Sequence, residues 1–285
     1  MVRMFHDVPD RPYYVFDIDG TLTRYVDVDP SAFLHGNFLF PIVRDLMVER
    51  GADPDEAAAA ILRETETNVY WDYCDLVSAF GLPAPEAYRR FRAWHAAHIA
   101  PWEDAVALAR ELRRAGKRLF VVSNNPVTGC LLKLQAAGLA DDTGSDVFSR
   151  ILGTNVLRGC KCAPGVWRRA LDRLGVDPAL VCTVGDNPVE DRDLPRACGA
   201  GACYLFDRGR IERGIDGAGF AGNDGAACGG NDGAACGGND GPASPAMTKS
   251  TISTVSTAST TSTASTVSTV STASTASTAS TAFNP

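Results

Sequence analysis

The sequence predicts an α/β protein with a parallel sheet, helices on both faces of that sheet, an inserted helical segment and a C-terminal tail of low complexity. Three observations support this fold class. After residue 100, short apolar runs of strand length alternate with helical patterns, which is typical of a parallel sheet with helical crossovers. Residues 25–99 have a helical pattern throughout. Beyond residue 210, almost no side chain is suited to a buried core.

The first expected strand covers residues 13–16, a short aromatic and β-branched run. It ends at the polar turn of residues 17–21, Asp-Ile-Asp-Gly-Thr. This pattern is typical of a buried strand that stops at a polar turn. We therefore expect Asp17 and Asp19 to lie at or just beyond the carboxyl end of the first strand.

The segment of residues 25–99 contains no predicted strand. A helix start is expected at Asp53, which would be the N-cap, with Pro54 at the first helical position and acidic residues in the first turn. A second helical stretch ends at Gly81, and a third covers residues 86–98. Because the segment is too long for a simple crossover, we expect a helical cap domain of residues 25–99, inserted into a core domain of residues 1–24 and 100–210.

From residue 101 onward, helices and strands are expected to alternate. The expected helices are residues 103–115, 127–137, 164–174 and a short one ending at Ala197, and the expected strands are residues 119–122, 151–152, 180–184 and 202–206. This order predicts a Rossmann-like sheet with right-handed crossovers. Ligands of such sheets bind outside the carboxyl ends of the strands, so the polar residues that follow the strands should meet at one rim.

The tail of residues 211–285 has a different composition. An eight-residue unit, Gly-Asn-Asp-Gly-Ala-Ala-Cys-Gly, starts at residue 222 and recurs, and residues 250–282 are mostly Ser-Thr-Ala and Ser-Thr-Val triplets. The repeat lacks the nonapeptide period and the aliphatic positions of a calcium-binding β-helix. Such a segment cannot offset its ordering entropy by burial, so we expect disorder.

Composition and charge exclude several classes of partner. The net charge is −7 and the pI is about 5.1, whereas nucleic-acid and anionic-membrane surfaces need an excess of Lys and Arg. No apolar stretch is long enough to span a membrane, and the polar N-terminus has no signal-peptide pattern. The nine cysteines are irregularly spaced, and Cys160 and Cys162 do not have the spacing of a zinc half-site. These features predict a cytoplasmic protein with reduced thiols and no nucleic-acid or membrane partner.

The acidic pair Asp17 and Asp19 suggests chemistry at the first strand end. Two carboxylates this close repel one another unless a cation lies between them or one is protonated. Either arrangement suits phosphoryl transfer, in which one carboxylate attacks phosphorus and the other protonates the leaving oxygen and later activates water. Taken alone, the pair would be interpreted as an acidic turn that ends a strand.

Other polar residues follow later strands or precede a helix. Ser123 ends the second strand, where a hydroxyl and nearby N–H groups suit a phosphate oxygen. Lys161 precedes a helix and could neutralise both Asp17 and a phosphate. Asp186 and Asp191 follow a later strand and are oxygen ligands of the kind that Mg²⁺ prefers. Each residue alone has an ordinary structural explanation, but their combination predicts an active site.

These motifs resemble those of the haloacid dehalogenase superfamily, in its phosphatase branch. Residues 17–23 match the first motif, D-x-D-G-T-L-T, without departure, and Ser123 with the neighbouring Asn124 matches the second. Lys161 with Pro164 matches the third motif, although Cys162 stands where a proline is common. Residues 185–191 contain the Gly-Asp and the later Asp of the fourth motif. The resemblance covers about residues 13–208.

The resemblance implies a role for each matched residue. Asp17 would be the nucleophile and Asp19 the general acid and base. Ser123, Asn124 and Lys161 would bind the substrate phosphate. Mg²⁺ would be held by Asp17, Asp186 and the backbone carbonyl of Asp19, with Asp191 supporting through water. The dehalogenases of the superfamily lack an acid at the position of Asp19, and a halide needs no proton to leave, so Asp19 favours phosphate chemistry.

The helical cap resembles those of phosphatases that act on small molecules, which predicts a small phosphorylated metabolite: phosphoglycolate, a sugar phosphate or a nucleotide monophosphate. A cap that closes over the site excludes water and large substrates. Residues 68 and 70–73 could face a sugar or base, although packing is the commoner role of such a cluster. Two alternatives remain: a phosphomutase, or a catalytically silent binding protein with an interaction tail. The oligomeric state remains open.

Overall fold

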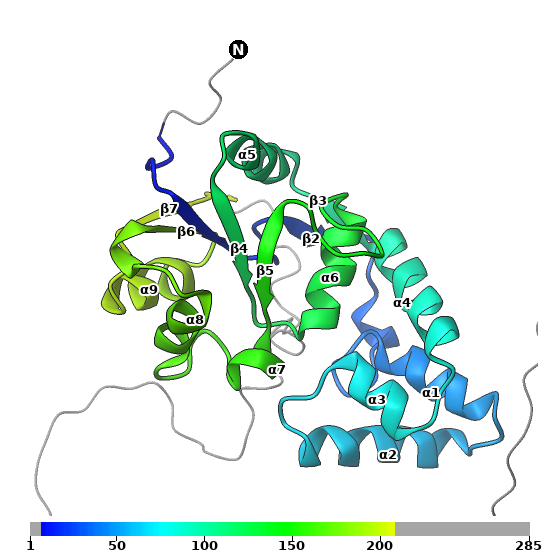
Figure 1. The fold of residues 1–285 in the computed structure, drawn as a ribbon. Coiled ribbons are helices and arrows are strands. Elements are labelled where there is room, and N and C mark those ends of the chain that lie inside the picture. Colours follow the sequence, from blue (N-terminus) through cyan, green and yellow to red (C-terminus); the bar gives the residue numbers. More distant parts are fainter. Residues whose placement is uncertain (1–6, 209–285) are drawn as a thin grey trace, which may run out of the picture. The chain divides into compact units, whose positions relative to one another are not determined.

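The structure is a computed structural model that describes residues 7–208, so the tail predicted at residues 211–285 lies outside the described residues. Its main sheet has five parallel strands in the order β5-β4-β1-β6-β7 (Figure 1). Their bounds are Tyr13–Phe16 for β1, Arg118–Val122 for β4, Phe148–Leu152 for β5, Val181–Gly185 for β6 and Ala202–Leu205 for β7. The predicted α/β class with a parallel sheet is confirmed.

Apolar side chains on both faces of the strands place the sheet between two helical layers. Along β1, Tyr14 and Phe16 pack with α5 and α6, whereas Val15 packs on the opposite face with α8. Side chains of a strand alternate between faces, so a strand covered on both sides is apolar at every position. The flanking helices are α5 (Glu103–Arg114), α6 (Val127–Ala136), α7 (Thr154–Leu157), α8 (Val166–Leu174) and α9 (Leu194–Ala197).

Four helices lie within residues 25–99: α1 (Phe40–Val48), α2 (Pro54–Thr67), α3 (Tyr73–Ala79) and α4 (Ala84–His98). They share an apolar core, in which the rings of Phe38 and Trp94 stack with centroids 4.1 Å apart. Helix α2 begins as expected, because the Asp53 carboxylate accepts hydrogen bonds from the N–H groups of the second and third residues of the helix. The assignment of residues 25–99 to a separate domain stays a prediction.

A short antiparallel pair of strands, β2 (Thr23–Tyr25) and β3 (Ile99–Pro101), was not expected from the sequence. The pair joins the two chain segments that lead into and out of helices α1–α4. The N–H of Val26 extends it with a hydrogen bond to the carbonyl of His98, 2.9 Å long. Three residues are too few to show the alternation by which a strand is recognised in a sequence, which explains why the prediction of no strand in residues 25–99 was wrong at both ends.

Several other elements differ in extent from the expectation. Strand β5 starts at Phe148 rather than at residue 151, and α7 was not predicted. Three short helical turns complete the described elements: the 3₁₀ turns η1 (Pro30–Ala32) and η2 (Pro178–Leu180), and the π-helical turn η3 (Val189–Asp193). Within residues 7–208, no helix has the length and apolar character needed to cross a membrane.

Candidate active site

The loop after β1 turns tightly because one carbonyl accepts several hydrogen bonds. The carbonyl of Ile18 accepts from the N–H groups of residues 21–23, at 2.8–3.2 Å. Gly20 has a φ of +77°, and a Cβ atom there would lie 2.3 Å from Oδ2 of Asp186. Any other residue at this position would therefore be strained in its backbone and would displace a carboxylate of the site. The turn thus places the backbone of Gly20 directly against the Asp186 carboxylate.

Arg208 holds the same loop from the far end of the described chain. Its guanidinium donates to the carbonyls of Gly20 (3.1 Å) and Thr21 (2.8 Å) and pairs with both oxygens of the Asp104 carboxylate. It also lies over the ring of Trp102, 4.3 Å from its centroid. Nothing in the sequence motifs points to this residue, which we identify from its contacts alone.

Three carboxylates converge at the carboxyl ends of β1 and β6. Oxygens of Asp17, Asp186 and Asp191 all lie within 4.8 Å of one another. The hydroxyl of Thr21 lies between two of them, 3.3 Å from Oδ2 of Asp17 and 3.1 Å from Oδ1 of Asp186. The Lys161 ammonium is 2.6 Å from Oδ1 of Asp17 and 2.8 Å from Oδ1 of Asp191. The structure thus brings together all of these predicted residues.

Burial and mutual repulsion raise the pKa values of these acids. The pKa of Asp17 lies well above its ordinary value, because the side chain is buried and because Asp191 and Asp186 add negative charge, while Lys161 opposes the shift. Burial, with the charge of Asp191, raises the pKa of Asp186 to about 6. Although burial alone would lower the pKa of Lys161, Asp17 and Asp191 hold it well above its usual range. The positive charge of Lys161 therefore does not balance the negative charge of the three carboxylates.

The cluster fits a divalent cation. Its donors are carboxylate oxygens, the hard ligands that Mg²⁺ and Ca²⁺ prefer, and they belong to three side chains whose oxygens already lie close together. A bound cation would remove the repulsion that raises the pKa values of Asp17 and Asp186. We therefore regard Asp17, Asp186 and Asp191 as a candidate cation site. The side chain of Asp19 does not belong to this cluster.

The loop after β4 supplies the polar groups on the other side of the site. The Ser123 hydroxyl oxygen accepts hydrogen bonds from the backbone N–H and the side-chain amide of Asn125, at 3.2 and 2.9 Å. The Asn124 side chain accepts from the N–H of Lys161 at 2.7 Å and donates to the Glu190 carboxylate at 2.9 Å. These bonds fix the loop of Lys161 against the end of β4.

Most of the predicted site residues line one cavity of about 150 Å³. Its lining consists of Asp17, Asp19, Ser123, Asn124, Lys161, Asp186, Asn187 and Glu190. Asp191 lies behind it, buried, with its carboxylate on Lys161 and on the N–H of Asn187. Asn187 and Glu190 were not predicted as site residues, although both stand within the matched fourth motif. The roles assigned to the lining residues by the resemblance stay predictions.

The Asp19 carboxylate has partners of its own. Lys133 of α6 donates to both of its oxygens, at 2.6 and 2.8 Å, and the Asn125 amide donates to Oδ2. Lys133 is fully buried, and sequence reasoning missed it. The available signal was a lysine on the apolar face of a predicted helix, three residues after Cys130 and four before Ala137, both of which are buried.

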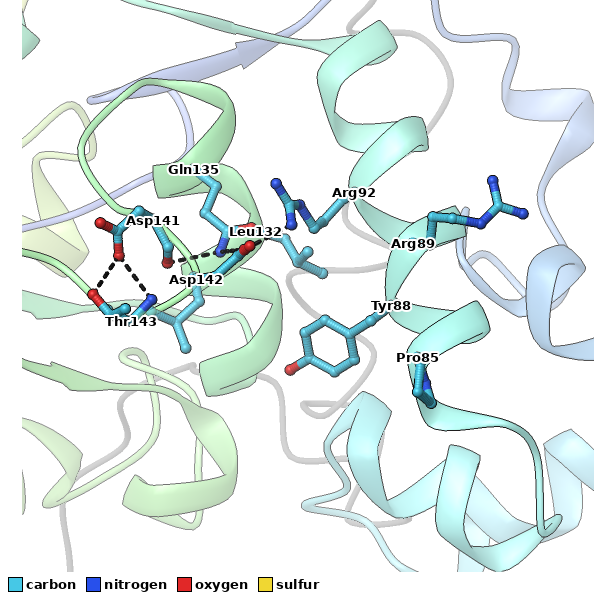
Figure 2. A pocket seen from close by; sticks show the side chains of 11 residues that line it. Pro85, Tyr88, Arg89, Arg92, Leu132, Gln135, Asp141, Asp142 and Thr143 are labelled. Carbon is cyan, nitrogen blue, oxygen red and sulfur yellow. Dashed lines mark hydrogen bonds and ion pairs between the residues drawn. The ribbon is translucent and has the colours of Figure 1, made fainter. Parts of the chain in front are cut away.

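A larger cavity, of about 490 Å³, lies between α4 and α6 (Figure 2). Tyr88 and Arg92 line it from α4, and Gln135 lines it from α6. Arg92 forms an exposed ion pair with Asp142, 2.7 Å long. Asp141 and Asp142 line this cavity, but within residues 7–208 the one group of three converging carboxylates lies at the smaller cavity. The smaller cavity is therefore the better candidate for an active site.

The polar and aromatic cluster of residues 70–73 serves structure in this fold. The Asp72 carboxylate caps α3 and accepts hydrogen bonds from the Thr128 N–H and the Asn155 amide, both 3.0 Å long, which ties α3 to α6 and α7. Tyr73 is buried against the ring of Trp71. These contacts match the packing role that was considered the commoner one for such a cluster.

The raised pKa of Asp186 predicts a measurable effect of pH on stability without metal. Its folded pKa of about 6 lies above the ordinary value of 3.8, so the folded state binds more protons between these pH values and loses stability as pH rises. We expect Asp186→Asn to be more stable than the wild type at pH 7.5 in EDTA, by an amount of the order of 2 kcal/mol, and equally stable near pH 4.

Thermal unfolding of both proteins across this pH range would test the prediction. The informative quantity is the difference in stability between the two proteins. Burial lowers the pKa of His95 to about 4, so His95 makes the stability of both proteins rise with pH, opposite to the effect of Asp186. A constant difference between pH 4 and 7.5 would show that the pKa of Asp186 is not raised in the folded protein.

The candidate site lies within a segment that matches a known protein family. The family profile of the haloacid dehalogenase-like hydrolases matches residues 13–199, which include every residue of the candidate cation cluster and the loops after β1, β4 and β6. The chain therefore belongs to the haloacid dehalogenase-like hydrolases. No match was found among curated protein sequences.

Solved structures with similar folds include enzymes of different chemistry. A HAD phosphatase from Thermococcus onnurineus is 24% identical, with 74% of this chain and 99% of that chain covered and a TM-score of 0.43. An L-2-haloacid dehalogenase from Xanthobacter autotrophicus is 20% identical, with 74% and 85% covered and a TM-score of 0.39. CbbY from Rhodobacter sphaeroides, in complex with phosphate, is 21% identical, with 75% and 92% covered and a TM-score of 0.42. The reaction must therefore be argued from the site itself.

Proposed function

We propose that this hydrolase is a Mg²⁺-dependent phosphatase that acts on a small phosphorylated metabolite through an aspartyl phosphate on Asp17. The observation that carries the proposal is the position of Asp19, whose carboxylate lines the same small cavity as Asp17 but stands apart from the three clustered carboxylates. An alkoxide needs a proton to leave, whereas a halide does not. A second acid in the cavity therefore favours phosphate esters over haloacids.

The proposed reaction has two steps. The first step requires Asp19 in its protonated form. A carboxylate oxygen of Asp17 attacks phosphorus, the bond from phosphorus to the ester oxygen breaks, and Asp19 gives that proton to the departing oxygen. Second, Asp19 takes a proton from a water molecule, the water oxygen attacks phosphorus, and the bond from phosphorus to Asp17 breaks. Inorganic phosphate leaves, and both aspartates return to their starting states.

Positive charge in the cavity would balance the charge of the phosphoryl group. Lys161 is the lysine that lines the cavity, and Ser123 and Asn124 line its other side with hydroxyl and amide groups. Asp17 and Asp186 would hold the Mg²⁺ ion, with the backbone carbonyl of Asp19 as a further ligand and Asp191 supporting through water. When bound, the ion supplies charge compensation for the phosphoryl oxygens and favours the ionised form of Asp17.

The size of the cavity supports a small substrate. Its volume of about 150 Å³ is below the usual range of ligand pockets, about 300–1,000 Å³. Phosphoglycolate, a sugar phosphate and a nucleotide monophosphate remain the substrate classes we propose. A phosphomutase would use the same first step but would return the phosphoryl group to a sugar.

Two parallel assays test the proposal. We expect purified protein with Mg²⁺ to release inorganic phosphate from p-nitrophenyl phosphate and no chloride from 2-chloropropionate. Chloride release without phosphate release would make the protein a dehalogenase. Isomerisation of a sugar phosphate without phosphate release would identify a mutase, and the absence of every activity would favour a silent binding protein.

A further inference from the structure

Lys133 is one of two lysines that are buried within the described residues, and it is not part of the phosphate cavity lining. Its ammonium is 2.6 and 2.8 Å from the two oxygens of Asp19, 2.8 Å from the hydroxyl of Tyr25 and 2.9 Å from Oδ1 of Asn125. We propose that Lys133 is a positioning residue that fixes the carboxylate of Asp19 for proton transfer. This inference rests on the phosphatase function proposed above.

The contacts of Lys133 join three separate parts of the fold. Asp19 belongs to the loop after β1, Tyr25 ends β2, and Asn125 belongs to the loop after β4. Lys133 itself projects from α6, so its position is set by the packing of that helix on the sheet. A side chain held from three directions has little freedom to move, which is what positioning a reactive group requires.

Asp19 is held at both oxygens. Lys133 donates to each of them, and the Asn125 amide adds a second donor to Oδ2. Asn125 in turn holds the hydroxyl of Ser123, so the same amide joins the acid to the predicted phosphate-binding loop. Because proton transfer requires the acid within hydrogen-bond reach of the leaving oxygen, the orientation of Asp19 is a direct condition of its role.

The burial of Lys133 needs an explanation beyond packing. Burying an ammonium is costly unless it is paired and hydrogen-bonded. Helix α6 fills neighbouring buried positions with apolar side chains, Cys130 and Leu134, so an apolar residue would suffice for packing alone. The ammonium also lies 4.9 Å from the centroid of the Tyr25 ring and 5.9 Å from that of Phe38. This environment is built around a charge whose ion-pair partner is Asp19.

The contact with Tyr25 extends the arrangement to the strand pair that leads to helices α1–α4. Tyr25 is the last residue of β2 and pairs with Ile99 of β3. A change in the position of this strand pair would therefore act on Lys133, and through Lys133 on Asp19. Tyr25→Phe removes the hydroxyl contact while it leaves the ring and the lysine in place, which makes it a mild test of the same arrangement.

The experiment compares two leaving groups on one enzyme. p-Nitrophenolate leaves without a proton, whereas phenolate is a poorer leaving group and depends more on an acid. We expect Lys133→Met to lower kcat for phenyl phosphate by about 10²-fold and kcat for p-nitrophenyl phosphate much less, which is the bias expected of Asp19→Asn. Combining Lys133→Met with Asp19→Asn should add little further loss, because both changes remove the same function.

Controls separate positioning from a general loss of structure. Tyr25→Phe should also lower kcat more for phenyl phosphate than for p-nitrophenyl phosphate. The loss on phenyl phosphate should be about fivefold, as expected for one hydrogen bond. Tyr88→Phe is its matched control, because that hydroxyl bonds to Thr128 in the contact between α4 and α6, away from Asp19. If Lys133→Met does not fold, Tyr25→Phe decides the question: its loss in kcat should be larger for phenyl phosphate than for p-nitrophenyl phosphate, and Tyr88→Phe should show no such difference.

The possible outcomes are distinct. Equal losses on the two substrates in Lys133→Met and Tyr25→Phe, with wild-type phosphate release intact, would overturn the positioning role and leave the phosphatase function standing. Absence of phosphate release from the wild-type protein would overturn the proposed function and this inference with it. A leaving-group bias shared by Lys133→Met, Tyr25→Phe and Asp19→Asn would establish the role.

Discussion

Asp17→Asn is expected to lower the turnover of p-nitrophenyl phosphate by at least about 10⁴-fold, because an amide cannot replace a carboxylate as the nucleophile. The same change should leave the fold intact. Asp17 is 7% exposed and stands among carboxylates whose repulsion, together with burial, raises its pKa. The neutral amide removes part of this repulsion, so in EDTA the variant should unfold at the same temperature as the wild type or at a higher one.

Steady-state phosphate release and thermal unfolding, measured on the same preparation, check both parts. Asp172→Asn is a matched control, because Asp172 is exposed on α8 and lies outside the cavity. Its turnover should equal that of the wild type. If Asp17→Asn keeps a tenth of the wild-type turnover, another group must be the nucleophile.

Removal of divalent metal is expected to abolish turnover, and addition of Mg²⁺ to restore it. Without metal, Asp17, Asp186 and Asp191 share a single lysine, and repulsion opposes the ionised form of Asp17 that the attack requires. A cation bound to the folded state also stabilises it, by about 2.7 kcal/mol at a concentration of 100 times Kd. For a folded part of about 200 residues this corresponds to a rise in Tm of roughly 5–10 °C.

Titration of metal-free protein with Mg²⁺, followed by thermal unfolding and by phosphate release, measures both effects. Asp186→Asn should lose most of the Mg²⁺-dependent rise in Tm, because it removes one carboxylate of the cluster. Asp172→Asn should keep the full rise. Full turnover in a protein shown by elemental analysis to contain no divalent metal would contradict the assignment of the cluster.

The sequence located the residues whose function depends on their position after a strand. Asp17, Ser123 and Asp186 follow β1, β4 and β6, and parallel strands bring such positions to one edge of the sheet. The apolar runs that define these strands are strong signals, because strands covered on both faces are apolar at every position. The fold class and the convergence of these three residues could therefore be predicted together.

The groups that were missed depend on contacts between distant elements. Lys133 lies on a helix, and it approaches Asp19 because of the way α6 packs on the sheet. A local sequence pattern does not predict that packing. The strand pair of β2 and β3 depends on a register between segments more than seventy residues apart in sequence, and each strand is only three residues long. Arg208 contacts the loop after β1 across a still longer separation in the sequence. Such features need the tertiary structure.

The hydrogen bonds from Arg208 to the loop after β1 bear on where the chain can be truncated. The family match ends at residue 199, but the donor for the carbonyls of Gly20 and Thr21 comes after it. A protein cut at the limits of the family match would keep every motif residue and yet lose the contacts of Arg208 with the loop after β1. We therefore expect a shortened protein to need Arg208 as well as the matched residues if the loop after β1 is to keep this support.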